Sequence, residues 1–172
     1  MSLLLLLLLL PLVCSASSSL CSSQVCLPVS YNAMNMPHSG SQQPFQVNYS
    51  ILLLDIYGVQ NDDFTIDTNI AMTLTWFDDR IMMSNRTNDS ISVDVRFIDN
   101  LWKPDIYFYD LKSLTFTEGI SPEKGLRLAK KGGRVEVTFK MEVQLVFVCP
   151  MIVSMFPFDR HICNMRFTSF SR

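Results

Sequence analysis

Two long segments alternate between apolar and polar residues, and this period of two limits the fold more than any other feature. In residues 64–76 one face carries Phe64, Ile66, Ile70, Met72, Leu74 and Trp76, while the other carries mainly Thr, Asp and Asn. Residues 135–147 repeat the pattern with Val135, Val137, Phe139, Met141, Val143, Leu145 and Phe147. Because successive side chains of a strand point to opposite faces, each segment predicts a long, half-buried β-strand.

The remaining pattern also indicates strands and no long helix. Residues 47–57 predict a strand that is apolar on both faces, 91–97 a shorter alternating strand, and 167–172 a last one. Residues 126–135 predict a hairpin whose tip is Lys130 to Gly133. No segment of ten residues carries a stripe with the helical period. We therefore expect an all-β fold, an antiparallel β-sandwich.

The amino terminus predicts export. Residues 3–10 are all leucine and are followed by small residues, which is typical of a signal peptide, here residues 1–16 with cleavage after Ala16. A single-pass anchor is the alternative, but the apolar run is short for a bilayer span. We expect an irregular arm over residues 17–44, with at most a short helical turn, and one sandwich domain over residues 45–172.

The cysteines and sequons fit the secretory pathway. Apart from Cys14 in the leader, the cysteines form two close pairs, Cys21 with Cys26 and Cys149 with Cys163, and an even number in an oxidising compartment favours disulfides. Sequons at Asn48, Asn85 and Asn88 predict glycosylation. The net charge of −2 argues against a nucleic-acid partner.

The sequence contains few residues that could catalyse a reaction or bind a metal. The two histidines are His38 and His161, and neither lies in a recognisable acid–base or nucleophilic grouping. Cys21 and Cys26 with His38, or His161 with Cys163, lack a second ligand pair for zinc. We expect no enzyme, no metal and no cofactor. An immunoglobulin-type sandwich is disfavoured, because its paired cysteines lie far apart around a tryptophan.

The segment between Cys149 and Cys163 is unusually apolar for a loop. It carries Met151, Ile152, Val153, Met155, Phe156 and Phe158, and Pro157 in its second half argues against a buried strand. Two interpretations are open: the loop contacts an apolar partner, or these side chains pack under the sandwich.

A second motif gathers aromatic residues around a Pro–Asp turn. Residues 101–109 contain Trp102, Tyr107, Phe108 and Tyr109. In an extended chain Tyr107 and Tyr109 share one face and Phe108 takes the other, and paired aromatic rings suit a cation. Packing in the core is the alternative.

From about residue 44 to residue 172 the sequence resembles the Cys-loop receptors, which are pentameric ligand-gated ion channels. The resemblance is carried by three motifs in order: Trp76, Asp78 and Arg80; Trp102, Pro104 and Asp105; and the loop motif of Cys149, Phe156, Pro157, Phe158, Asp159 and Cys163.

The resemblance implies roles for particular residues. In such receptors the loop from Cys149 to Cys163 presses on the channel domain and carries ligand binding to the gate, whereas soluble relatives tend to have a polar loop. Tyr107, Tyr109 and Phe170 fall at aromatic positions of an agonist site between subunits. Ala71 and Thr73 stand where many relatives carry an aromatic residue or arginine on the opposite face.

These implications give the expected function. The chain resembles the extracellular ligand-binding part of a ligand-gated ion-channel subunit, truncated before its last strands and its membrane-spanning helices. Its expected partners are other subunits of a pentamer, a small agonist such as a cationic amine, and the membrane through a C-terminal channel domain. We expect a plasma-membrane location for the full-length subunit. The alternative is a soluble, secreted ligand-binding protein of the same fold, and an adhesion module comes third.

Overall fold

The computed structural model describes residues 20–21, 24–38, 44–84, 89–116, 125–155 and 157–169. Within these residues the elements are β1 (Leu20–Cys21), β2 (Val25–Leu27), β3 (Val47–Gln60), β4 (Thr65–Phe77), β5 (Met82–Met83), β6 (Ser90–Val93), the 3-10 helix η1 (Val95–Asn100), β7 (Ile106–Phe108), β8 (Leu111–Phe116), β9 (Gly125–Lys131), β10 (Arg134–Val148) and β11 (Phe167–Ser169). The pairs that these strands form are all antiparallel, so the predicted all-β class is confirmed.

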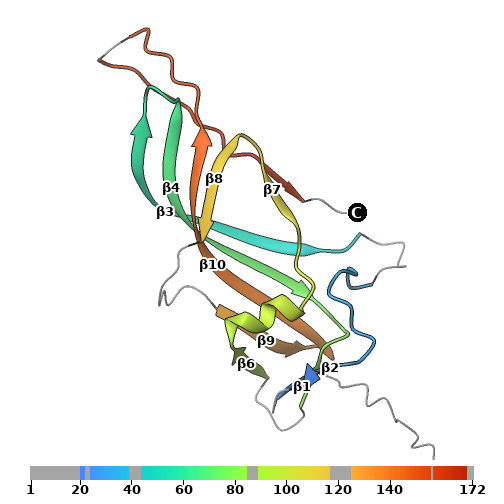
Figure 1. Cartoon of the computed structure of the whole chain (residues 1–172). Coiled ribbons are helices and arrows are strands. Elements are labelled where there is room, and N and C mark those ends of the chain that lie inside the picture. Colours follow the sequence, from blue (N-terminus) through green and yellow to red (C-terminus); the bar gives the residue numbers. More distant parts are fainter. Residues whose placement is uncertain are drawn as a thin grey trace, which may run out of the picture.

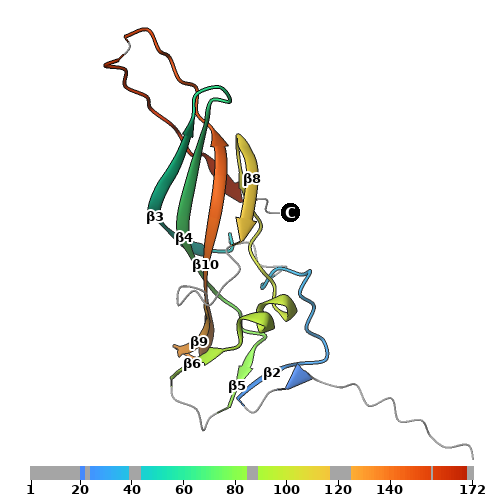
Figure 2. The same ribbon diagram turned by 60° about the vertical axis from the view of Figure 1, so that its left-hand side comes forward.

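The main sheet is organised around β10. Its six strands follow the order β3-β4-β10-β9-β6, and β8 also pairs with β10. The strand β4 pairs with β10 from Glu136 to Val148, while β9 takes the first half of the other edge of β10 and β8 the second half. The two segments with the clearest alternation are therefore adjacent central strands, side by side in both views of the ribbon (Figures 1 and 2).

The core follows the predicted faces of these strands. The buried apolar residues of β4 and β10 are Ile70, Met72, Leu74, Trp76, Val135, Val137, Val143, Leu145 and Phe147. Leu126 and Leu128 of β9 join the same cluster. Burial of each large apolar side chain of this kind stabilises the fold by about 1.5–3 kcal/mol. This burial holds the main sheet to the other segments of the core cluster.

A second, smaller layer consists of β7 and β11. The two strands pair with Phe167 opposite Phe108, and these rings lie 5.9 Å apart between centroids. The ring of Phe167 also meets Tyr49 of β3 edge to face at 4.9 Å. The contact between Phe167 and Tyr49 thus packs the two-stranded sheet on the main sheet, which agrees with the predicted sandwich.

Two predicted strand assignments are wrong in detail. Phe64 does not share the inward face of β4, because it lies in the preceding turn with φ of 52° and is largely exposed. The strand predicted over residues 91–97 ends at Val93. The carboxylate of Asp94 accepts a hydrogen bond from the backbone N–H of Arg96 at 2.9 Å, which caps η1 and turns the chain out of the sheet.

The arm contains more structure than predicted. The strands β1 and β2 pair with each other, and β2 pairs with β5 in a separate three-stranded sheet. Val25 and Leu27 alternate about Cys26 and are buried in the main core. The predicted irregular arm is therefore wrong for this part, since a three-residue strand is too short to show a period in the sequence.

The strand β3 forms one edge of the main sheet. It pairs with β4 along its length, with register shifts between Leu53 and Asp55 and between Ile56 and Gly58. Its exposed large apolar residues are Tyr49, Leu52, Leu53, Leu54, Ile56, Tyr57 and Val59. The predicted strand with two apolar faces is thus present, and much of its side-chain surface faces outward.

No helix in the described part of the chain has the length and apolarity that crossing a membrane requires.

Candidate functional site

The two tyrosines of the aromatic motif lie on the outer side of the β7–β11 layer. Tyr107 is opposite Thr168 in the strand pair, and the backbone N–H of Tyr109 donates to the carbonyl of Arg166 at 2.8 Å. Tyr107 is 49% exposed and Tyr109 45%, whereas Phe108 between them is buried. The predicted alternation at this motif is confirmed, and the core-packing alternative holds for Phe108.

The tyrosine rings contact one another and a cation of the chain itself. Their centroids are 5.3 Å apart in an edge-to-face arrangement. The guanidinium carbon of Arg166 lies 5.6 Å from the centroid of Tyr109, within the range of a cation–π contact. Arg166 also forms an ion pair with Asp110 at 2.6 Å, and this hydrogen bond raises the pKa of the arginine. The aromatic face is therefore able to hold positive charge.

The structure does not place the other residues implied for the agonist site beside the two tyrosines. Phe170 lies outside the described residues, so its position beside the tyrosines stays a prediction. Ala71 and Thr73 lie half-buried on β4, in the main sheet and not in the layer of β7 and β11.

A buried carboxylate explains the first tryptophan motif. Asp78 follows β4 and is fully buried. The guanidinium of Arg80 donates to both of its oxygens, from Nε to Oδ1 and from NH2 to Oδ2, each at 2.8 Å. A buried carboxylate is costly unless it is paired and hydrogen-bonded. The spacing of Asp78 and Arg80 supplies that two-pronged partner.

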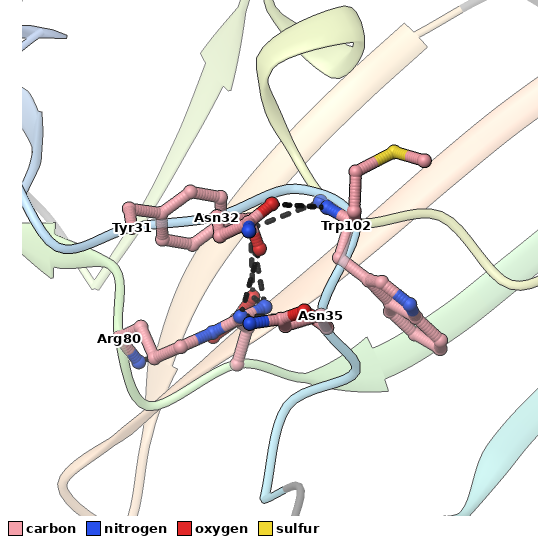
Figure 3. A network of polar contacts seen from close by, with 7 residues as sticks. Tyr31, Asn32, Asn35, Arg80 and Trp102 are labelled. Atoms are coloured by element: carbon pink, nitrogen blue, oxygen red, sulfur yellow. Dashed lines mark hydrogen bonds and ion pairs between the residues drawn. The ribbon is translucent and has the colours of Figure 1, made fainter.

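Three residues of the arm complete this network, which we call the polar clasp: Tyr31, Asn32, Asn35, Asp78, Arg80 and the backbone N–H of Trp102. Tyr31 donates its hydroxyl hydrogen to Oδ2 of Asp78 at 2.9 Å and accepts from the N–H of Trp102 at 2.9 Å. NH1 of Arg80 donates to the carbonyls of Asn32 at 3.1 Å and Asn35 at 2.8 Å. Figure 3 shows these residues converging from three segments of the chain.

The ring of Tyr31 is held by the same residues. The guanidinium carbon of Arg80 lies 4.4 Å from its centroid. Burial, with a further contribution from the charge of Asp78, raises the pKa of Tyr31 to about 12. The sequence contains no signal for Tyr31, Asn32 or Asn35, because their partners lie more than 40 residues away. Asn32 and Asn35, moreover, contribute only their backbone oxygens to the polar clasp.

The second tryptophan motif packs beside the clasp. The ring of Trp102 meets Trp76 edge to face at 6.1 Å and Phe45 at 5.2 Å. Pro104 is half-buried and leads into β7. Asp105 is exposed, and no other described residue donates a hydrogen bond to its carboxylate. The two tryptophans therefore join the arm and the sheet.

Both predicted disulfides are present. Cys21 is bonded to Cys26 across the β1–β2 pair, and Cys149 is bonded to Cys163. Cys149 is fully buried, and its N–H donates to the carbonyl of Phe64 at 2.7 Å. The loop between Cys149 and Cys163, which we call the stapled loop, is thus anchored to the turn before β4.

The tip of the stapled loop is ordered by local hydrogen bonds. The N–H of Phe158 donates to the carbonyl of Met155 at 2.8 Å, which closes a turn that includes Pro157. Oδ1 of Asp159 accepts from the N–H of Met155 at 2.7 Å. This explains the aspartate of the motif. Phe156 lies outside the described residues, so its role in the loop motif stays a prediction.

Most apolar residues of the stapled loop face outward. Met151 is buried, but Ile152, Val153, Met155, Phe158 and Ile162 are each 62–85% exposed. In Figure 2 the loop extends beyond the ends of β4 and β10, away from the polar clasp. Packing under the sandwich therefore holds for Met151 alone among the described residues of the predicted set.

The described residues hold no group of three or more His, Cys, Asp or Glu side chains arranged to bind a metal. Of the three sequons, Asn48 is exposed on β3, while Asn85 and Asn88 lie outside the described residues. Glycosylation at all three stays a prediction.

The comparison with protein families agrees with this architecture. The family model described as the neurotransmitter-gated ion-channel ligand-binding domain matches residues 23–172. The match includes the polar clasp, the aromatic face and the stapled loop, so it extends over most of the chain. This chain therefore belongs to the family of neurotransmitter-gated ion-channel ligand-binding domains.

Proposed function

We propose that the chain is the extracellular ligand-binding part of a ligand-gated ion-channel subunit, and that the stapled loop transmits ligand binding to the channel domain. Domains of this family bind small neurotransmitters. They lie outside the cell as parts of pentameric channels, and such channels are not enzymes. The specific partners of this chain are therefore other subunits of a pentamer and a membrane-embedded channel domain.

The observation that supports coupling is the exposed apolar tip of the stapled loop. Five large apolar side chains at the end of one loop form a surface that water solvates poorly. Such a surface is stabilised when it contacts another apolar surface, and a channel domain below the sandwich supplies one. A soluble, secreted binder of the same fold would leave this apolar surface exposed to water.

For the ligand, we propose a cationic amine at the face of Tyr107 and Tyr109, with Phe170 as the third ring. The contact of Arg166 with Tyr109 supports this, because the ring already accepts a positive group. Each ring contributes about 0.5–2 kcal/mol to a bound cation.

The coupling is tested with Phe158→Ser in a full-length subunit that carries this domain. We expect smaller agonist-evoked currents with unchanged surface expression and ligand affinity, because the loop loses apolar contact with the channel domain. Thr115→Ser, on an exposed part of β8, is the matched control. Unchanged currents from Phe158→Ser together with Ile152→Ser would show that the apolar tip of the stapled loop does not carry the coupling.

The ligand face is tested with Tyr107→Ala and Tyr109→Ala in the same subunit. Loss of one ring should raise the agonist concentration for half-maximal current by about 2-fold to 30-fold, from the same 0.5–2 kcal/mol. Surface labelling controls for expression. If both variants respond to agonist like the parent, the tyrosines do not form the site.

A further inference from the structure

The second half of the stapled loop carries a stripe of exposed side chains in which a cation lies between two apolar groups. Phe158 and Ile162 are 85% and 81% exposed, the highest values among the described apolar residues of the loop. Arg160 between them is exposed as well. The chain over residues 159–166 forms neither helix nor turn, and side chains two apart in an extended segment lie on the same side. The three side chains therefore form one surface, which we call the loop stripe.

Arg160 supplies the cation of the loop stripe. Among the described residues, no group accepts a hydrogen bond or an ion pair from its guanidinium. The neighbouring acid, Asp159, has its Oδ1 engaged by the backbone N–H of Met155 at 2.7 Å. A guanidinium carries five N–H donors and binds a phosphate group through two of them. The loop stripe thus offers a phosphate-binding group with an apolar group on each side.

The backbone that carries the loop stripe is held in place. Cys149, which is fully buried, is bonded to Cys163 directly after Ile162. At the tip, the N–H of Phe158 donates to the carbonyl of Met155 at 2.8 Å. Groups on a rigid frame lose little conformational freedom when they bind, so this arrangement favours association with a surface.

The stapled loop is also the outermost part of its end of the molecule. In both ribbon views it extends past the turn between β3 and β4 (Figures 1 and 2). That turn carries the exposed acids Asp62 and Asp63, and the chain after the loop carries the ion pair of Arg166 with Asp110. A flat surface that approaches this end therefore meets the loop stripe before it meets these carboxylates.

We propose that the stapled loop docks on a lipid bilayer, where Phe158 and Ile162 enter the boundary between headgroups and acyl chains and Arg160 binds a lipid phosphate. Interfacial binding grows with the apolar area that enters the lipid and with the attraction of basic groups to the headgroups. A purely apolar protein surface would leave Arg160 without an acceptor, whereas a bilayer places phosphates directly above its acyl chains.

This inference deepens the proposed coupling, because it rests on the same loop and adds the lipid around the channel domain as a second partner. The two proposals are nevertheless tested apart. Vesicles contain no channel domain, so vesicle binding does not depend on coupling, and the currents of Phe158→Ser report on coupling in the assembled receptor.

The experiment places a tryptophan in the loop stripe and follows its quenching by lipids that are brominated along the acyl chains. The full chain with Phe158→Trp is mixed with phosphatidylcholine vesicles, with and without bromine. We expect bromine to lower the emission of this variant but not that of the parent, whose Trp76 and Trp102 lie at the other end of β4. Quenching reports on position 158 itself, so contact of another part of the chain with the vesicle does not imitate it.

The phosphate contact is tested by adding Arg160→Gln to the Phe158→Trp chain. On vesicles that also contain phosphatidylglycerol, the lipid concentration for half-maximal quenching should rise about fivefold, the effect of one basic residue near an anionic surface. Arg160→Lys keeps the charge and should change it much less.

Two matched variants control for the position of the tryptophan. Thr115→Trp, on an exposed part of β8, should not be quenched. Tyr57→Trp reports on the exposed apolar strand β3. The proposal is wrong if bromine leaves the emission of Phe158→Trp unchanged, if Tyr57→Trp or Thr115→Trp is quenched as strongly, or if Arg160→Gln leaves half-maximal quenching where it was.

Discussion

The phenolic oxygen of Tyr31 joins three segments of the chain by hydrogen bonds: it donates to Asp78 and accepts from the N–H of Trp102 and, at 3.4 Å, from Arg80. Tyr31→Phe removes all three and leaves a buried carboxylate with one partner fewer. We expect the free energy of unfolding to fall by about 1–3 kcal/mol, the cost of an unsatisfied buried group. Urea unfolding at neutral pH measures it, and Tyr57→Phe on the exposed strand β3 is the control that should change little.

The same hydroxyl makes stability depend on alkaline pH. The pKa of Tyr31 rises from 10.0 to about 12 on folding, so the folded chain keeps the proton that the unfolded chain releases. This contribution is fully present below pH 10 and is lost as pH rises through about 12. Urea midpoints measured from pH 9 to pH 11.5 should fall more steeply for the parent than for Tyr31→Phe. Equal slopes would contradict the shift.

The sequence predicts residues whose partners are close along the chain and misses residues whose partners are distant. Asp78 and Arg80 form a local pair whose spacing is visible in the sequence, and Tyr107 and Tyr109 follow the period of a strand. Tyr31 and Arg166 act through partners 47 and 56 residues away, at Asp78 and Asp110. Nothing local marks such residues until the fold brings the partners together.

At the scale of elements, the hairpin between β9 and β10 depends on two glycines. Gly132 and Gly133 have φ of 58° and 80°, the values of a two-residue type I′ turn. A Cβ added at either position meets no atom within 4 Å, so backbone conformation alone decides the effect of substitution. Gly132→Val should cost about 1–2 kcal/mol in unfolding free energy, and Gly132→Asn much less. Equal losses for the two variants in urea unfolding would refute this account.

Element prediction succeeded where alternation was long. The faces of β4 and β10 follow from the alternation over residues 64–76 and 135–147, and the turn glycines mark the hairpin. It failed where a cap or a distant contact decided the outcome. Asp94 ends β6 by capping η1, and β2 is a strand because it pairs with β1 and β5.

The exposed edge strand β3 should drive self-association. Within the described residues it pairs on one side with β4, and its outward apolar residues include Leu53 and Ile56. Unpaired, apolar edges recruit other chains. Leu53→Lys with Ile56→Lys should reduce concentration-dependent association in sedimentation experiments. Ser92→Lys with Thr115→Lys adds the same charge elsewhere, and an equal reduction by that control would show that charge alone is responsible.

At the scale of the whole molecule, β4 and β10 connect two different ends. Near one end of these strands lies the polar clasp, where the N–H of Asp78 donates to the carbonyl of Val135 at 2.9 Å. At the other end the backbone N–H of Cys149, where the stapled loop begins, donates a hydrogen bond to the carbonyl of Phe64. The arm is thus fixed at one end and the exposed apolar tip at the other, with two central strands between them (Figure 1).

The two disulfides should contribute unequally to this arrangement. The bond from Cys149 to Cys163 spans a sequence separation of 14, and that from Cys21 to Cys26 a separation of 5. In the chain-entropy model these loops are worth about 3 and about 2 kcal/mol. Replacing Cys149 and Cys163 by serine also places two polar groups near a buried position, so its cost should be the larger. Guanidinium unfolding of the two double variants measures both losses, and a larger loss for the Cys21 and Cys26 pair would contradict the prediction.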